Sequence, residues 1–385
     1  MRECLAWLAF ILMLPGAAAA EERAGGSALW IHPKARALTL ADNAMVMLVL
    51  QDGSLLRVSR GGSQRSADDG KTWSAPTTIY DGPAPGRIGG GGLLLKTVKG
   101  TILLVYHDPD TRVLQWDRKT GEVSDDTRND VWAIRSTDGG HTWGDRQHIS
   151  SLVGELPYCL SLIQLAQLAD GTIVVPLQPR RREPNRNVIT TVTSRDEGET
   201  WTRSETILDI GGAGLHDGLL EPSVIGLRDA RAYMLLRTNL GWLYESFSAD
   251  GGLHWTEAKP TDLDASSAPS FMLRLADGRV LLAWNRAAPS DGSAPVLRQG
   301  AGWSSEPASW HRAELSVALS DDDCHTWSDP VVVARCDGRE LAYPYVLERR
   351  PGTVWIITRY RAARGAAVQL EIDQSALCPP KGATP

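Results

Sequence analysis

Six residues of this chain carry side chains suited to anion binding, proton transfer or nucleophilic attack, and each lies near a short apolar or glycine-rich segment. They are Arg87, Asp108, Glu221, Arg237, Arg312 and Tyr343. A guanidinium group binds a carboxylate through two parallel charge-assisted hydrogen bonds. A phenol becomes a nucleophile when a nearby carboxylate takes its proton, and a carboxylic acid can protonate a leaving group. Together, such groups could bind an acidic molecule and cleave it, provided that the fold brings them to one place.

A repeated eight-residue pattern, Ser-x-Asp-x-Gly-x-x-Trp, gives the strongest indication of the fold. It begins at Ser66, Ser136, Ser194, Ser248 and Ser320, and Cys324 takes the place of Gly in the last copy. Ser and Asp side chains can bond to nearby backbone N–H groups, Gly permits a turn conformation, and Trp can pack on the sheet beneath. Each copy therefore predicts a structural turn rather than a catalytic group. Five copies in one chain indicate a fold built from similar units.

Short β-rich segments lie between these turns, and no long stretch has helical periodicity. The clearest are residues 45–50, 101–106, 172–177, 232–237, 279–284 and 353–358. Several follow an Asp-Gly or Pro-Gly turn, which is typical of hairpins. Units of about 60 residues would number six, within the usual range for propellers. We therefore predict an all-β, six-bladed β-propeller, with a β-sandwich or a solenoid as the alternatives.

The repeated turn occurs five times, so one of six blades should lack it. We expect that blade to be closed by both ends of the chain. The segment after Tyr343 and the segment around residues 28–58 would then share blades across this seam.

Residues 1–20 have the features of a secretory signal peptide. Arg2 supplies a positive charge, Leu5 to Leu14 form an apolar run, and Ala18-Ala19-Ala20 offers a cleavage site. The run is short for a membrane-spanning helix, although a retained anchor is the alternative. We expect a single domain over residues 21–385 in a secreted or periplasmic protein, with no integral membrane segment after signal removal.

Charge and cysteine content narrow the function further. The net charge is −6 and there is no long basic block, which argues against a nucleic-acid partner. Cys324 and Cys336 are the closest pair among the four cysteines after residue 20, which are Cys159, Cys324, Cys336 and Cys378. A disulfide between them and two buried free thiols both remain open. The cysteine spacing does not match a zinc site, and no metal or organic cofactor is implied.

The repeated turn resembles the Asp box of the sialidase (neuraminidase) superfamily, and the resemblance covers roughly residues 45–360. Sialidases hold the carboxylate of a sugar with three arginines, and the resemblance places these at three positions. Arg87 lies in Gly86-Arg87-Ile88-Gly89, which keeps the Arg-Ile of the family motif but lacks its flanking residues. Arg237 follows the segment that begins Glu221-Pro222 by about one strand pair, as the second family arginine does. Arg312 precedes the last Asp box.

The resemblance also assigns the groups that would carry out the reaction. It implies Tyr343 as the nucleophile, with Tyr345 as the alternative, and Glu221 as the paired carboxylate. A neutral phenol suits a sugar whose carboxylate lies on the anomeric carbon, because a carboxylate nucleophile would meet a like charge. Asp108, with Asp110 in reserve, takes the place of the general acid/base, a role that requires a raised pKa.

These roles describe a secreted exo-alpha-sialidase that removes terminal sialic acid with retention of configuration. Its partner would be a sialylated or other acidic glycan. Two alternatives remain: a hydrolase or lyase of the same fold that acts on another acidic sugar, and a carbohydrate-binding propeller without turnover. His216 and Asp217 could act together as a further general base, or they could form a simple turn. Tyr158, Trp242 and Asn285 could line the sugar pocket or pack between blades.

Overall fold

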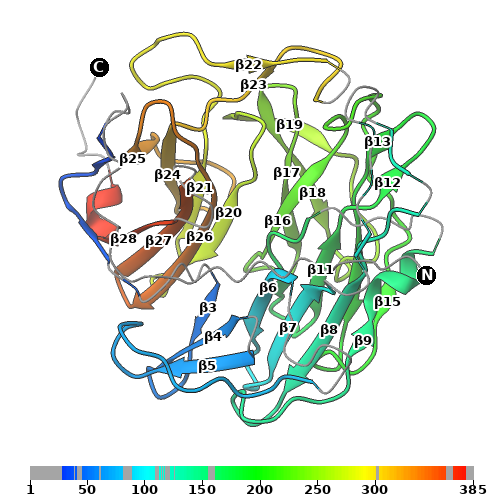
Figure 1. Cartoon of the computed structure of the whole chain (residues 1–385), viewed down its shortest axis with the longest axis vertical. Coiled ribbons are helices and arrows are strands. Elements are labelled where there is room, and N and C mark those ends of the chain that lie inside the picture. The colour runs from blue at the N-terminus through cyan, green and yellow to red at the C-terminus, as the bar shows by residue number, and fades with distance from the viewer. Residues whose placement is uncertain are drawn as a thin grey trace, which may run out of the picture.

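The computed structural model contains six antiparallel β-sheets arranged around a central axis, which confirms the predicted six-bladed propeller (Figure 1). The structure describes residues 28–38, 40, 46–59, 62–80, 89–108, 112–113, 115, 117, 122–124, 126–154, 161–300, 303–360 and 367–378. The expected signal peptide therefore lies outside the described residues, as do Arg87, Asp110, Tyr158 and Cys159.

Each blade begins at the axis and runs outward. The innermost strands are β3 (Met47–Val49), β6 (Gly89–Lys96), β10 (Ala166–Gln167), β16 (Leu220–Gly226), β20 (Phe271–Arg274) and β26 (Leu341–Arg350). The second strands are β4 (Leu55–Ser59), β7 (Ile102–His107), β11 (Ile173–Leu177), β17 (Ala232–Arg237), β21 (Val280–Trp284) and β27 (Thr353–Tyr360). The third strands are β5 (Gly62–Ser66), β8 (Val131–Ser136), β14 (Thr190–Ser194), β18 (Trp242–Ser248), β24 (Glu314–Ser320) and β28 (Ala367–Asp373).

Shorter elements complete the sheets and decorate the ends. The outer strands are β9 (Gln147–His148), β15 (Thr202–Arg203), β19 (Lys259–Asp264), β25 (Val331–Arg335) and β2 (Ala35–Ala37), with β1 (Trp30–Ile31) beyond β25. Two hairpins stand apart from the blades: β12 (Arg180–Arg181) with β13 (Arg186–Asn187), and β22 (Leu297–Arg298) with β23 (Ala308–Ser309). The described helices are the 3₁₀ turns η1 (Ile149–Val153) and η2 (Gln374–Leu377), and neither is long and apolar enough to cross a membrane.

The hydrophobic core lies between neighbouring blades. Residues of β7 and β8 pack in one cluster with Ile173, Val175 and Val192 of the next blade, all of them buried. A second strand is covered on both faces, which explains its continuous run of β-branched and other apolar residues. This burial also explains why five of the six predicted apolar segments coincide with second strands, whereas residues 45–50 contain the innermost strand β3.

The chain ends meet in one blade, as predicted. Strand β2 pairs with β28, with Arg36 opposite Glu371, and so completes the blade of β26 and β27. This blade lacks the repeated turn. The shared segment is narrower than predicted, because residues 47–59 form β3 and β4 of a separate blade that carries its own copy of the turn.

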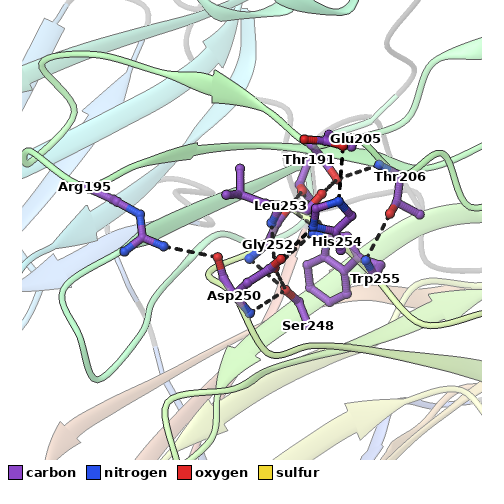
Figure 2. Close-up of polar contacts among 11 residues, drawn as sticks. Thr191, Arg195, Glu205, Thr206, Ser248, Asp250, Gly252, Leu253, His254 and Trp255 are labelled. Carbon is purple, nitrogen blue, oxygen red and sulfur yellow. Dashed lines mark hydrogen bonds and ion pairs between the residues drawn. The ribbon is translucent and has the colours of Figure 1, made fainter.

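The repeated turns are structural, and Figure 2 shows the fourth copy. The Ser248 hydroxyl accepts a hydrogen bond from Gly252 N at 2.8 Å and donates to Asp250 Oδ1 at 2.9 Å. The Trp255 indole N–H donates to the Thr191 hydroxyl of the neighbouring blade at 3.0 Å. The turn therefore closes its own hairpin and also joins two blades.

Strand direction separates these turns from the candidate site. In all five copies the Ser is the last residue of a third strand. In an antiparallel sheet, the end of the third strand lies opposite to the end of the second strand and the start of the first. The residues that begin innermost strands and end second strands therefore gather on the face of the ring away from the turns.

Two buried cysteines settle one open alternative. Cys324 and Cys336 are both buried and form no disulfide with each other, so the thiol alternative holds for this pair. Burial raises the pKa of Cys324 to about 12, which keeps the thiol protonated at neutral pH.

Candidate active site

Glu221 and Tyr343 occupy matching positions at the start of innermost strands β16 and β26. Glu221 has φ of 40° and Tyr343 has φ of 60°, and both values are unusual for residues other than glycine. The ladder is irregular at each residue, between Leu220 and Ser223 and between Ala342 and Tyr345. Such irregularities redirect a side chain out of the normal alternation, and strained backbone of this kind gathers at functional sites.

The two side chains meet directly. The Tyr343 hydroxyl donates a hydrogen bond to Glu221 Oε1 at 2.9 Å, and the Ser161 hydroxyl donates to the same oxygen at 3.1 Å. Arg237 Nη1 donates to Glu221 Oε2 at 2.5 Å. Burial alone would raise the pKa of Glu221, but the charge and hydrogen bond of Arg237 outweigh it and hold the pKa below its ordinary value. Glu221 is therefore an ionised carboxylate in contact with a phenol whose proton it could accept.

Arg237 and Arg312 both bond to Ser267. The two arginines are almost completely buried. Arg237 Nη2 donates to the Ser267 hydroxyl at 2.8 Å, and Arg312 Nη2 donates to the Ser267 carbonyl oxygen. The Arg312 guanidinium also lies 3.8 Å from the centre of the Trp310 ring and 5.7 Å from that of Tyr343. Burial, followed by the charge of Arg237, lowers the pKa of Arg312 to about 10, so Arg312 is still a cation at neutral pH.

The structure thus brings together four of the six residues singled out from the sequence: Glu221, Arg237, Arg312 and Tyr343. Asp108 follows β7 and is buried, and its Oδ2 accepts a hydrogen bond from Arg146 Nη1 at 2.9 Å. Asp108 is therefore held in an ion pair outside the Tyr343–Glu221 contact. Its role as general acid stays a prediction.

The secondary candidates have structural contacts. Tyr345, the alternative nucleophile, is buried and donates to the Met47 carbonyl oxygen at 2.6 Å, which joins β26 to β3. Burial raises the pKa of Tyr345 above that of a free phenol. Asn285 Nδ2 bonds to the carbonyl oxygens of Glu314 and Leu341 and so joins two blades. Both residues stabilise the ring.

His216 and Asp217 do not form a general-base pair in the described part of the structure. Asp217 accepts hydrogen bonds from Ser304 and Ser305, whereas the His216 ring stacks on Trp303 with centroids 5.2 Å apart. Burial lowers the pKa of His216 to about 3, so the imidazole is neutral. Trp242, at the start of β18, is exposed.

A pocket opens beside Asp217. It has a volume of about 480 Å³ and is lined by small and polar residues: Ala213, Gly214, Gln299, Gly300, Ser304 and Ser305. Asp217 fixes its wall, because the carboxylate also accepts a hydrogen bond from Ala213 N at 3.1 Å. The stacked His216 and Trp303 connect this pocket with Trp310, on which Arg312 lies.

Sequence reasoning missed one charged neighbour of the phenol. Arg359, near the end of β27, has its guanidinium carbon 4.1 Å from the centre of the Tyr343 ring. It corresponds in its blade to Arg237, which ends β17. A search of every second-strand end for a polar residue would have found Arg359 and also Gln178, whose Oε1 accepts the hydrogen bond of Glu221 N.

Comparison with known proteins adds a family to this geometry. A model of the BNR repeat-like domain matches residues 62–356, which is most of the chain. The chain belongs to this BNR repeat-like family. The matched range contains the five Asp boxes together with Glu221, Arg237, Arg312 and Tyr343.

The relatives of this BNR-repeat chain include sialidases. A sialidase of Paraclostridium sordellii is 28% identical over 168 residues, covering 38% of this chain and 39% of the relative. A Trypanosoma rangeli sialidase, solved with 2,3-difluorosialic acid as a covalent intermediate, has a TM-score of 0.55 at 13% identity and covers 92% of this chain and 60% of its own. A Dyadobacter fermentans protein of unknown function has a TM-score of 0.58 at 18% identity and covers 90% of this chain and 99% of its own.

These matches define the fold and the family. The chain spans about two fifths of the length of the curated sialidase and about three fifths of the T. rangeli sialidase. The chain is a BNR-repeat protein with a sialidase-like propeller fold.

Proposed function

We propose that this protein is an exo-alpha-sialidase that releases terminal sialic acid with retention of anomeric configuration. The observation that carries the proposal is the hydrogen bond of 2.9 Å from the Tyr343 hydroxyl to Glu221 Oε1, with the charges of Arg237 and Arg312 beside it. This arrangement joins a nucleophile, its base and an anion-binding group in one place.

In the proposed reaction, Arg237 and Arg312 bind the carboxylate of the sugar. The Tyr343 oxygen attacks the anomeric carbon while its proton passes to Glu221 Oε1. The bond to the leaving oxygen breaks, and that oxygen takes a proton from the general acid, for which Asp108 is the candidate. Water then attacks the same carbon and gives a proton to the acid/base, while the bond between that carbon and the Tyr343 oxygen breaks and this oxygen recovers its proton from Glu221. Two displacements at one carbon retain the configuration.

Turnover of a fluorogenic sialoside tests the proposal. Tyr343→Phe keeps the ring but removes the nucleophilic oxygen, so we expect turnover to be lost. Tyr345→Phe is the matched control, because it removes the hydroxyl of a buried tyrosine that donates to the Met47 carbonyl oxygen, away from Glu221. It should fold and keep its activity. A 3-fluorosialyl fluoride should add its sugar mass to the peptide that contains Tyr343. Full turnover by folded Tyr343→Phe would contradict the proposal.

One observation favours a second candidate, a carbohydrate-binding propeller without turnover. The carboxylate of Asp108 is occupied by Arg146, whose guanidinium lies between the rings of Trp132 and Tyr80 at 4.2 and 4.8 Å. A permanently ion-paired Asp108 would leave the leaving group without this proton donor. Tight binding of a sialoside without release of sialic acid would support this candidate. Activity only on uronic-acid glycans would instead indicate another acidic sugar as the substrate.

Secretion is also part of the proposal, and the apolar run of residues 5–14 supports it. Expression of the full chain in a bacterial host with a secretory pathway should yield an exported form. Sequencing its N-terminus should give a start near Glu21. An exported or retained protein that still carries residues 1–20 would argue for an anchor.

A further inference from the structure

Arg359 is placed against the candidate nucleophile by the ladder between β26 and β27. It lies opposite Ala342, the residue before Tyr343, and the neighbouring Thr358 hydroxyl donates to the Ala342 carbonyl oxygen at 2.9 Å. These contacts fix the end of β27 beside Tyr343. The Arg359 guanidinium carbon then lies 4.1 Å from the centre of the phenol ring, within cation–π range.

The three arginines around Tyr343 differ in how far their donors are already used. Arg237 is 2% exposed, and its Nε, Nη1 and Nη2 atoms all donate to Ser267 or Glu221. Arg312 is 3% exposed, and its Nη2 donates to the Ser267 carbonyl oxygen. Arg359 is exposed and forms no ion pair within the part of the chain that the structure describes. Of the three, its guanidinium is the most accessible to an incoming anion.

We propose that Arg359 binds the carboxylate of the acidic sugar directly, as a guanidinium additional to Arg237 and Arg312. This inference rests on the proposed function of the Tyr343 site. The carbon that Tyr343 attacks is the carbon that carries the carboxylate, so a cation stacked on the Tyr343 ring lies where that carboxylate must come. A guanidinium can meet it with two parallel hydrogen bonds. Arg359 is not one of the three arginines that the family resemblance assigns.

The test crosses two protein forms with two ligands. The ligands are 2-deoxy-2,3-dehydro-N-acetylneuraminic acid and its carboxamide, which lacks the negative charge. The proteins are the wild type and Arg359→Met, which keeps an apolar stem over the ring but removes the guanidinium. We expect calorimetry to show that Arg359→Met weakens binding of the acid by roughly 10- to 100-fold, as for loss of a hydrogen bond between charged groups. Binding of the carboxamide should change little.

Two further variants sharpen this result. Arg359→Lys keeps the charge without the planar pair of donors, so its affinity for the acid should lie between the other two forms. Arg231→Met is the matched control. Arg231 also lies over an aromatic ring, that of Phe247 at 5.6 Å, but it precedes β17 at the opposite end of the strand from Arg237. Its replacement should leave the affinity for both ligands unchanged.

The possible failures can be told apart. If Arg359→Met retains the preference of the wild type for the acid, or weakens both ligands equally, Arg359 does not bind the carboxylate and the inference is overturned while the proposed function stands. If the wild type binds neither ligand although it is folded, the proposed function fails and the inference fails with it.

Discussion

Glu221 links the base chemistry of the site to the stability of the fold. It accepts hydrogen bonds from Tyr343 and from the buried Arg237. Glu221→Gln keeps the shape but can no longer take the phenol proton, so we expect turnover to fall by about 10²- to 10⁴-fold. Arg237 would remain buried without its counter-charge, which should lower the free energy of unfolding by roughly 3–5 kcal/mol. Sialoside turnover and urea unfolding measure the two effects.

Ser161→Ala is the control for this prediction, because it removes only a neutral donor from the same carboxylate oxygen. It should cost about 1 kcal/mol of stability and far less activity. The lowered pKa of Glu221 gives the pH dependence its sign: its stabilising effect is present at neutral pH and is lost as the pH falls through that lowered pKa. Equal stability of the wild type and Glu221→Gln at neutral pH would contradict this account.

At this scale, the sequence predicts some contacts better than others for a physical reason. Glu221 and Arg237 lie on adjacent strands of one blade, with Leu220 opposite Arg237, so local pairing alone brings them together. Tyr343 reaches Glu221 from a different blade, and the packing of the blades of β16, β20 and β26 against one another makes that contact possible. The family resemblance supplied Tyr343 by its order along the chain. Nothing of this kind pointed to Arg359, or to the ion pair that Arg146 makes with Asp108.

Most of the second strands were predictable, because a strand that is buried on both faces is rich in apolar residues along its length. The segment expected at 232–237 is β17 with the same bounds, and that expected at 353–358 begins β27. The ends of the chain were harder to place. Strand β2 has three residues, two of them exposed, and its position follows from the unpaired edge of β28 rather than from its own sequence.

The fourth Asp box carries a pH-dependent link between blades. His254 stands at the position where the other four copies have a Thr that bonds to the Asp of its own turn. The His254 ring bonds to Asp250 Oδ2 at 2.7 Å and to Glu205 Oε2 of the neighbouring blade at 3.2 Å (Figure 2). These two carboxylates raise the pKa of His254 above 6.5. The stabilisation is therefore complete below that value and is lost as the pH rises through the raised pKa.

His254→Thr would restore the side chain of the other copies and remove the link to Glu205. We expect thermal unfolding to show the largest advantage of the wild type over this variant near pH 5.5, with the difference shrinking toward pH 8.5. His141→Ala is the control, because His141 of the second Asp box is exposed and uses only its backbone N–H on Asp138. A difference between wild type and His254→Thr that stays constant with pH would exclude the proposed titration.

For the molecule as a whole, the geometry of the candidate site depends on how the blades are arranged in the ring. Tyr343 comes from the blade of β26, which β2 completes. Glu221 comes from the blade of β16, and the blade of β20 lies between the two. The seam is made by three residue pairs between β2 and β28, together with an ion pair of 2.7 Å between Arg36 and Glu371. The short strand β2 thus joins the two ends of the described chain through few contacts. We therefore expect this seam to limit global stability.

A disulfide across the seam tests this expectation. Arg36 and Glu371 are register partners 335 residues apart in sequence, so Arg36→Cys with Glu371→Cys, in a Cys378→Ser background, would close a very long loop. Chain entropy predicts that oxidation raises the free energy of unfolding by roughly 6 kcal/mol, against about 3 kcal/mol for a loop of some 15 residues. Glu245→Cys with Lys259→Cys is the control, since these partners lie within one blade. Denaturant unfolding of each oxidised and reduced form cancels the effect of the substitutions themselves. If the seam disulfide stabilises no more than the control, opening of the seam does not limit unfolding, and the blades must come apart elsewhere in the ring.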